Sequence, residues 1–408
     1  MNNVVVVGAG AAGMIAAGVA AKKGCTVTLI EKNEKPGRKL MITGKGRCNL
    51  TNACDLNECL SNIPRNSRFL YSALSQFSTN DTMNFFEDLG VKLKIERGKR
   101  VFPESDKAYE VVDALRSFIK KSGCVVYHGR AIEIVINDNK AVGVKLEDGR
   151  IIKADKIIIC TGGKSYPLTG STGDGYKLAE QAGHIVTPLM PSLVPLETKE
   201  SFVLELQGLS LKNVTIEVTD TITKKQIYSE LGEMLFTHFG VSGPLILSAS
   251  SHMREMQENR YKISIDLKPG LTIEQLDIRI QRDFLKNNNK DFINSLNELL
   301  PTKLIPVFVK YCGIDENLKI NQLTKEMRRQ IVYKLKHFEI TISGFRPIAE
   351  AIITSGGVSV NEISPKTMES KLVQGLFFAG EILDCDAYTG GFNLQIAFST
   401  GFVAGSSV

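Results

Sequence analysis

The chain has 408 residues, enough for two or three domains, and its 43% hydrophobic and 23% charged residues are those of an ordinary globular protein. No apolar run reaches the roughly 18 residues of a membrane-spanning helix, and the first predicted strand begins at residue 3, so we expect neither a membrane segment nor a signal peptide. The formal net charge of +6 is mild for this length, and it permits contact with nucleic acid without requiring it.

The eight cysteines form no CxxC pair and no pair with histidine. Cys48, Cys54 and Cys59 lie close together in the sequence, but their spacing is not that of a metal site. We therefore expect no bound metal and no disulfide framework, which indicates a protein of the reducing cytoplasm.

Residues 3–31 carry the pattern of a dinucleotide-binding βαβ unit. The apolar run Val4–Val7 predicts a strand, and the turn Gly8-Ala9-Gly10-Ala11-Ala12-Gly13 follows it directly. An Ala-rich stretch then predicts a helix, and Thr26–Ile30 predicts a second strand. A lone GxGxxG sequence is weak evidence, whereas strand, turn, helix and strand in this order indicate a nucleotide site.

The residue types in this unit suit a bound pyrophosphate. Gly8 permits the tight turn, Gly10 lets the backbone approach the phosphates, and Gly13 allows the helix to pack closely on the strand. The helix N-terminus presents free N–H groups to the phosphates. Glu31 can accept hydrogen bonds from a ribose 2′-OH, which argues against NADP in this site. The predicted contacts of the ADP half are Gly8, Gly10, Gly13 and Glu31, and Ala12 and Lys32 are further predicted cofactor contacts.

The middle of the chain predicts alternating helices and strands and then a long insertion. Residues 33–52 are rich in glycine and basic residues and predict an extended loop. Three prolines near residue 190 mark a boundary, after which residues 190–268 look β-rich and residues 272–338 look helical. The elements predicted before the boundary are a helical region over 66–89, a basic turn at 97–102, a helix over 107–121, strands at 125–128, 131–137, 141–146, 150–153 and 156–160, and a helix over 174–182.

After Ser343-Gly344-Phe345, the chain returns to apolar strands and Gly-Gly turns, with a strand at Gly375–Ala379 and a closing helix. We therefore predict an α/β fold, in which a doubly wound, Rossmann-like domain is formed by two separated segments around an insertion. The predicted domains are residues 1–189 and 343–408 for the nucleotide-binding domain, 190–271 for a β-rich subdomain and 272–342 for a small helical subdomain.

Several motifs resemble those of flavoproteins with two dinucleotide-binding folds. Ala154–Gly163 is similar to the strand and turn that close their FAD site, and Leu376–Asp384 is similar to their second FAD motif. More specific are the strings Lys39–Asn52, Phe236–Pro244, Thr367–Lys371 and Thr389–Gln395. Together they resemble, over essentially the whole chain, the bacterial NAD(P)/FAD-dependent oxidoreductases of the aminoacetone-oxidase and BaiN-like type. That family includes relatives of a bile-acid reductase and of a ribosomal RNA dihydrouridine synthase.

The resemblance implies noncovalently bound FAD and an inserted subdomain that is barrel-like. It places the backbone of Ala131 at the adenine, and an acid of the second motif on the ribityl chain. Arg38 and Lys39 would neutralise the pyrophosphate, and backbone donors near Thr43 would face the flavin ring. The other predicted FAD contacts are Gly44, Gly46, Thr161, Gly162, Gly163, Gly380, Glu381, Asp384, Gly391, Phe392, Asn393 and Leu394.

Three residues are candidates for catalysis: Cys48, His238 and Arg47. The Cys48 thiol could supply a proton while the flavin supplies a hydride, although free cysteines are more often buried small hydrophobic residues. His238 could be a general acid, a substrate anchor or a structural histidine. Arg100 could clamp an anionic substrate or lie in a surface turn. We predict a cleft between the flavin and the 236–244 loop, lined by Arg47, Cys48, His238 and Asn393.

We favour an enzyme that moves a hydride through FAD, either to reduce an activated C=C bond or to oxidise a small molecule. The first alternative is a reductase of uracil in ribosomal RNA, with the basic stretch Lys325–His337 as its docking surface rather than a merely solvated face. The second is a non-enzymatic, flavin-binding redox regulator. Because only one dinucleotide motif is visible, we expect NAD(P)H, if it is the electron donor, to bind transiently over the flavin.

Overall fold

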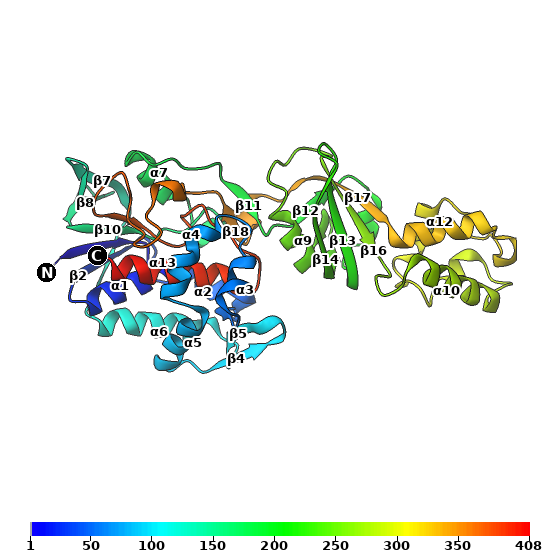
Figure 1. The fold of residues 1–408 in the computed structure, drawn as a ribbon, viewed down its shortest axis with the longest axis horizontal. Helices are drawn as coiled ribbons and strands as arrows, with labels where there is room; N and C mark the ends of the chain where they lie inside the picture. Colours follow the sequence, from blue (N-terminus) through cyan, green and yellow to red (C-terminus); the bar gives the residue numbers. More distant parts are fainter. Residues whose placement is uncertain (1) are drawn as a thin grey trace. The chain divides into compact units, whose positions relative to one another are not determined.

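The structure is a computed structural model that describes residues 2–408. The chain divides into two compact units: unit 1 holds the residues up to Ser192 together with Pro347–Val408, and unit 2 holds Leu193–Arg346. Each unit has its own hydrophobic core, and Figure 1 shows their elements coloured along the sequence. Within the described residues, no helix combines the length and the apolar character that a membrane crossing needs.

Unit 1 is built on a five-stranded parallel sheet. Its order is β19 (Leu376–Phe378), β10 (Lys156–Ile159), β1 (Asn3–Val7), β2 (Thr26–Glu31) and β6 (Val125–His128). The central strands β1 and β10 are almost entirely Val and Ile, as expected where both faces of a parallel sheet are covered. β19 comes from the second segment and pairs with β10, so two distant parts of the chain form one sheet. The predicted α/β fold class is confirmed.

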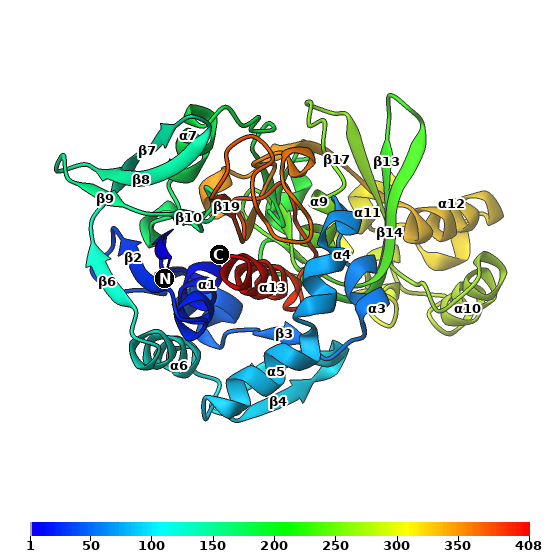
Figure 2. The ribbon, with the colours of Figure 1, turned by 60° about the vertical axis from the view of Figure 1, so that its left-hand side comes forward.

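Two helices of unit 1, α1 (Ala11–Lys22) and α13 (Phe392–Ser406), lie in backbone contact. A Cβ atom on Gly401 would lie 2.5 Å from the carbonyl oxygen of Ala12, and one on Gly405 would lie 2.4 Å from that of Ala16. From the first contact to the second, the chain advances by four residues in α1 and by four residues in α13, so the two helices run parallel. Figure 2 shows them side by side.

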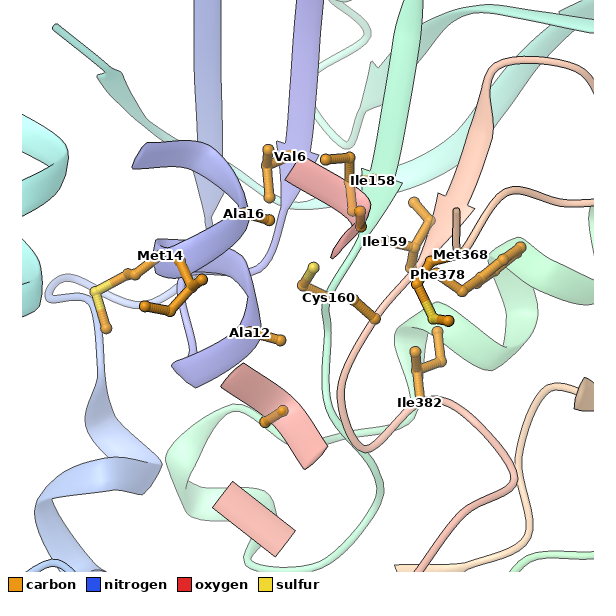
Figure 3. Close-up of a cluster of buried hydrophobic side chains, with 14 of the residues drawn as sticks. Val6, Ala12, Met14, Ala16, Ile158, Ile159, Cys160, Met368, Phe378 and Ile382 are labelled. Atoms are coloured by element: carbon orange, nitrogen blue, oxygen red, sulfur yellow. The ribbon is translucent and has the colours of Figure 1, made fainter. Parts of the chain in front are cut away.

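Small side chains let α1 approach the sheet closely. Ala12 and Ala16 of α1 are buried beside Val6 of β1 and Cys160 at the end of β10, as Figure 3 shows. This packing fixes where the N-terminus of α1 lies relative to the ends of the strands, and the candidate site is built at that point.

Smaller elements complete unit 1. Residues 33–52 were predicted as an extended loop, but they contain a short helix, a 3-10 turn and a strand, because Leu40 and Leu50 are buried in the core. The helical region 66–89 is two helices, because Ser78 forms a capping box with Asp81 and starts the second one. The bounds are α2 Arg38–Ile42, η1 Thr43–Gly46, β3 Thr51–Asn52, α3 Leu56–Ser61, α4 Ser67–Gln76, α5 Thr79–Asp88, β4 Leu93–Glu96, η2 Arg97–Lys99, β5 Arg100–Pro103, α6 Ala108–Lys121, β7 Ala131–Asn137, β8 Lys140–Leu146, β9 Ile151–Lys153, η3 Pro167–Thr169, α7 Asp174–Gln181, β11 Met190–Ser192, η6 Ile348–Glu350, β18 Ile353–Ser355 and η7 Val360–Glu362.

Unit 2 contains a closed six-stranded barrel and a group of helices. The barrel order is β12 (Leu196–Thr198), β15 (Gly240–Ser242), β14 (Lys225–Phe236), β13 (Ser210–Asp220), β16 (Tyr261–Asp266) and β17 (Phe338–Phe345). β17 runs across the boundary predicted at residue 342, because its alternating apolar residues complete the barrel between β16 and β12. The helices are α8 Phe202–Glu205, α9 Pro244–Ser250, α10 Ile273–Lys286, η4 Phe292–Ser295, α11 Ile305–Cys312, η5 Ile320–Gln322 and α12 Lys325–Lys336.

Candidate functional site

The turn between β1 and α1 leaves open space in front of a helix N-terminus. Gly8 has a φ of +99°, and a Cβ there would lie 2.6 Å from the carbonyl oxygen of Cys160. A Cβ on Gly13 would lie 1.8 Å from the carbonyl oxygen of Gly8, whereas one on Gly10 would meet no atom within 4 Å. No side chain caps α1, and its first turn holds no acidic residue, so its N–H groups suit an anionic ligand.

Glu31 lies against this turn from the end of β2. Its Oε2 accepts a hydrogen bond from the Ala9 N–H at 2.8 Å, and its Oε1 accepts one from the Asn33 N–H at 2.7 Å. The carboxylate is buried, as is Ala131 at the start of β7. The structure therefore holds the predicted ribose acid rigidly beside the phosphate turn.

Lys32 points toward the N-terminus of α7. Its Nζ donates to the carboxylate of Asp174 at 2.7 Å, and the guanidinium of Arg130 donates to the same carboxylate at 2.9 Å. Partial burial alone would raise the pKa of Asp174, but hydrogen bonds from Arg130 and Lys32 lower it to about 2. The predicted FAD contact of Lys32 thus competes with an ion pair inside unit 1.

Asp174→Asn is expected to lower the stability of the protein at neutral pH by about 1 kcal/mol or less, because the pair is partly exposed. A folded-state pKa near 2 lies below the unfolded value of about 3.9, so the ionised carboxylate stabilises the fold above the unfolded pKa. That contribution is lost as pH falls from about 4 toward 2. Urea denaturation of both proteins should show their difference shrinking over this window, and a pH-independent difference would contradict the assignment.

A second network joins the two segments of unit 1. Lys39 Nζ donates to Ser165 Oγ and to Glu381 Oε2, both at 2.7 Å. Glu381 Oε1 accepts from Ser165 Oγ and from the Thr354 N–H, each at 3.0 Å. A Cβ on Gly163 would lie 2.5 Å from Thr354 Oγ1 and 2.7 Å from Glu381 Oε1, so this network fills the space beside the glycine. Lys39 and Glu381, two of the predicted FAD contacts, thus lie together beside Gly163, and their side chains bind each other.

Two buried oxygens near this network have no hydrogen-bond partner among the described residues. One is Oγ1 of Thr161, two residues after the end of β10. The other is Asp384 Oδ1, which forms an ion pair with the Arg65 Nε and has no further partner within residues 2–408. Asp384 Oδ2 accepts from the Arg65 guanidinium at 2.8 Å. Thr161 Oγ1, and Asp384 Oδ1 beside its ion pair with Arg65, could still bind the hydroxyl groups of a polar ligand such as a ribityl chain.

The N-terminus of α13, like that of α1, has no side-chain cap and no acidic residue in its first turn. Its N-cap Gly391 has a φ of +100°, and a Cβ there would lie 2.3 Å from the carbonyl oxygen of Thr51. Gly401 of α13 lies level with Ala12 in the first turn of α1, and the two helices are parallel. Because α13 begins at Phe392, nine residues before Gly401, its N-terminus extends roughly 13 Å past the N-terminus of α1. Two parallel helices whose uncapped N-termini are offset along their axes fit an elongated ligand with separated polar groups, such as a dinucleotide. The donor set therefore fits FAD.

The other predicted contacts in this region have mainly structural partners. Asn393 Oδ1 accepts from the Ala387 N–H, and its Nδ2 donates to the Ala387 carbonyl, so it holds the loop before α13. Phe392 is buried and Leu394 is half-buried. Gly380 has a φ of +83° and contacts Ala12 of α1, and Gly162 has a φ of +73°. Arg38 is exposed, with a weak 3.4 Å hydrogen bond to Asn33.

The loop that includes η1 has an unusual run of left-handed backbone. Gly44, Lys45 and Gly46 have φ values of +55°, +58° and +84°, and Cys48 has +59°. Thr43 Oγ1 donates to the Leu40 carbonyl at 2.7 Å and closes the turn from α2. Non-glycine residues adopt this conformation only where the surroundings enforce it, and such positions cluster at functional sites.

Arg47 and Cys48 end this loop and point to different surroundings. The Arg47 guanidinium forms ion pairs with Glu96 and Asp106 and lies 4.1 Å from the centre of the Phe102 ring. Cys48 is completely buried, and this burial raises the pKa of its thiol to about 11. Arg47 therefore anchors the loop to the β4–β5 hairpin, and the Cys48 thiol keeps its proton at neutral pH.

The remaining candidates lie outside this arrangement. His238 belongs to unit 2, where it is exposed and its ring packs edge-on against Phe239, with centroids 4.9 Å apart. Arg100 is exposed on the β4–β5 hairpin. Among residues 2–408, no group of three or more His, Cys, Asp or Glu side chains could hold a metal ion. The cleft between the flavin and the 236–244 loop stays a prediction, as do the roles of Cys48 and His238.

Sequence reasoning missed Arg65, Ser165 and Thr354. Arg65 pairs with Asp384 across 319 positions, and Thr354 Oγ1 accepts from the N–H groups of Lys164 and Ser165. None of the three belongs to a motif that the sequence analysis singled out. Their segments are distant in the sequence and meet in the fold, where β19 pairs with β10 and β18, which contains Thr354, pairs with β11.

Comparison with known proteins identifies the family. The family model of the HI0933-like protein Rossmann domain matches residues 2–407. The chain belongs to this family. It is 30% identical over 409 residues to 3-dehydro-bile acid delta(4,6)-reductase of Clostridium scindens, covering 99% of this chain and 98% of that protein. It is 32% identical over 410 residues to ribosomal RNA dihydrouridine synthase of Haemophilus influenzae, again covering 99% and 98%.

Among solved structures, the open conformation of a flavocytochrome c3 fumarate reductase matches with a TM-score of 0.54 at 18% identity, covering 100% of this chain and 78% of that chain. This likeness shows a shared fold. The family membership confirms the predicted recognition, and the protein is an FAD-dependent oxidoreductase. The alternative of a non-enzymatic regulator therefore loses its support, while the specific reaction is a matter for proposal.

Proposed function

We propose that this enzyme reduces a carbon–carbon double bond conjugated to a carbonyl group. The observation that carries the proposal is that two full-length relatives with different substrates are named for the same bond change. A delta(4,6)-reductase removes C=C bonds from a bile acid, and dihydrouridine differs from uridine by two hydrogens across one C=C bond. The similar identities of 30% and 32% do not favour either substrate.

Within unit 1, the chain supplies the binding and orienting groups for this reaction. FAD, once bound and reduced by an electron donor such as NAD(P)H, would supply the hydride, and a separate acid must supply a proton. The N–H groups at α1 and the carboxylate of Glu31 would hold the ADP half, while Asp384, fixed by Arg65, would hold the ribityl chain. Arg47 holds the loop that bears Cys48 in place through its ion pairs on the β4–β5 hairpin.

Two groups could supply the proton, and each has a structural condition. The Cys48 thiol holds its proton, because burial raises its pKa to about 11, but complete burial means that the 43–48 loop must move before it reaches a substrate. His238 is exposed and needs no such movement within unit 2, but its role requires that the 236–244 loop reach the flavin. Kinetics of variants can separate the two.

The test is reoxidation of the reduced flavin without oxygen. Wild-type enzyme is reduced chemically and mixed with progesterone, a steroid enone, or with ribosomal RNA from cells that lack the protein. We expect the yellow flavin absorbance to return with at least one of them, together with the saturated product. The variants Cys48→Ser and His238→Ala should both still bind FAD. The variant that lacks the proton donor should be reoxidised about 100-fold more slowly than the wild type.

Cys312→Ser is the matched control, because Cys312 is also buried but lies on α11 in unit 2 and has no role in the proposal. It should reoxidise at the wild-type rate. If neither substrate class reoxidises the flavin, the proposed reaction is wrong. If both the Cys48 and His238 variants react at the wild-type rate, neither side chain donates the proton.

A further inference from the structure

The β4–β5 hairpin of unit 1 ends in exposed basic residues. Arg97 and Arg100 are both exposed, and the Arg100 Nε donates to the Arg97 carbonyl at 3.0 Å. In the described part of the chain, no carboxylate lies within ion-pair distance of either guanidinium, whereas Lys99 pairs with Glu58. Ile95 on β4 is 61% exposed beside them. The tip therefore offers two unneutralised guanidinium groups and an apolar side chain.

A single buried side chain links this tip to the flavin side of unit 1. Asn52 Nδ2 donates to the Gly98 carbonyl at 3.0 Å and to the Gly390 carbonyl at 3.1 Å. Gly390 directly precedes Gly391, the N-cap of α13. The hairpin tip is thus held one side chain away from the helix N-terminus that completes the candidate FAD site.

The carboxylates on the hairpin side are already used. Arg47 forms ion pairs with Glu96 and Asp106, and Lys94 donates to Asp106 at 2.7 Å. Hydrogen bonds from these cations hold the pKa of both carboxyl groups below its usual range. The acids therefore stay ionised and paired at neutral pH, and they leave the charges of Arg97 and Arg100 available to a ligand.

The basic helix α12, predicted as the docking surface for RNA, is different. Arg328 pairs with Asp277 at 2.7 Å, and Lys334 Nζ donates to the Tyr311 carbonyl at 2.5 Å. Lys336 pairs with Asp266 and donates to the Leu271 carbonyl. Of its five basic residues, only Lys325 and Arg329 remain exposed. Most of the positive charge of α12 is therefore paired with carboxylate or carbonyl groups of unit 2.

We propose that the hairpin tip, residues 95–100, binds the phosphodiester backbone of an RNA strand whose base is the substrate. Guanidinium groups bind phosphate oxygens in a bidentate manner, and two of them on a rigid turn fix the register of a strand. The proposal rests on the proposed function, and of its two substrate classes it favours uracil in RNA. A small anionic substrate held by the same arginines is the competing outcome.

The first experiment measures binding of fluorescein-labelled oligouridine to the FAD-loaded enzyme at several salt concentrations. Each phosphate contact on a single strand contributes about 0.7 to the slope of log K against log salt. For Arg97→Gln/Arg100→Gln we expect the slope to fall by about 1.4 and the affinity at low salt to fall about tenfold. Lys325→Gln/Arg329→Gln removes the same charge from α12 and should change the slope by much less.

An unchanged slope in the hairpin variant, or a larger change in the α12 variant, would overturn the proposal. The same variants are then tested for flavin reoxidation by progesterone, which carries no charge. This rate should be unchanged in the hairpin variant, while reoxidation by ribosomal RNA falls. A binding measurement with an anionic steroid acid, such as dehydrocholic acid, tests the competing outcome. If the hairpin variant binds this acid more weakly than the wild type but binds oligouridine normally, the arginines hold a small anionic substrate and the proposal is wrong. If neither progesterone nor ribosomal RNA reoxidises the reduced flavin of the wild-type enzyme, the proposed reaction itself is wrong.

Discussion

Gly10→Ala is expected to weaken FAD binding by about tenfold, or about 1.4 kcal/mol, while the free energy of unfolding of the apoprotein changes by less than about 0.5 kcal/mol. The φ of Gly10 is −85°, which any residue adopts, and an added Cβ meets no atom within 4 Å. The methyl group would therefore cost nothing within the fold, but it would occupy the space that the phosphates need at the α1 N-terminus. Fluorescence titration with FAD and urea denaturation of the apoprotein measure the two effects.

Gly13→Ala provides the matched comparison, because the same methyl group is added one helical turn further on. Its Cβ would lie 1.8 Å from the carbonyl oxygen of Gly8, and a backbone atom cannot rotate away. We expect a loss of about 3 kcal/mol in the free energy of unfolding, since α1 must move off β1. If Gly10→Ala destabilised the apoprotein as much as Gly13→Ala, or bound FAD normally, the open space would not be the phosphate site.

The sequence was sufficient wherever the structural cause is local. The apolar runs of β1, β2 and β10 predict buried parallel strands, because a strand covered on both faces needs no polar residues. Gly8 and Gly13 predict the βα turn, because only glycine fits the positive φ of one and the contact distance of the other. The return to apolar strands and Gly-Gly turns after residue 343 predicts that a second segment rejoins the first domain, and β19 of that segment pairs with β10.

The sequence was insufficient where a contact joins distant residues. Lys39 and Glu381 were predicted as FAD contacts, but they lie 342 positions apart and bind each other. The sequence left open whether Cys48 is buried or faces the flavin, since this depends on how the 43–48 loop packs within unit 1, where the thiol is completely buried. Similarly, the charges of α12 look available in the sequence, and only their partners on other elements show that most are paired.

Arg65→Gln is expected to lower the free energy of unfolding by about 3 kcal/mol, a large effect for one partly exposed side chain. The side chain of Asp384 is only 6% exposed, and Arg65 is its ion-pair partner. Removing the guanidinium leaves a buried carboxylate without a compensating charge, which costs more than the net contribution of the pair itself. Urea denaturation of the apoprotein measures this loss. The Asn66 side chain still donates to the Asp384 carbonyl at 2.5 Å, so the loop keeps one of its attachments.

The double variant Arg65→Gln/Asp384→Asn separates charge from packing. Because it removes both charges, its stability should recover most of the loss, and the cycle of single and double variants gives the coupling energy. Its FAD affinity should nevertheless stay below that of the wild type, since the carboxylate of Asp384 is the group proposed to hold the ribityl chain. A double variant that is no more stable than Arg65→Gln would show that Arg65 acts through packing alone. One that binds FAD as tightly as the wild type would remove Asp384 from the site.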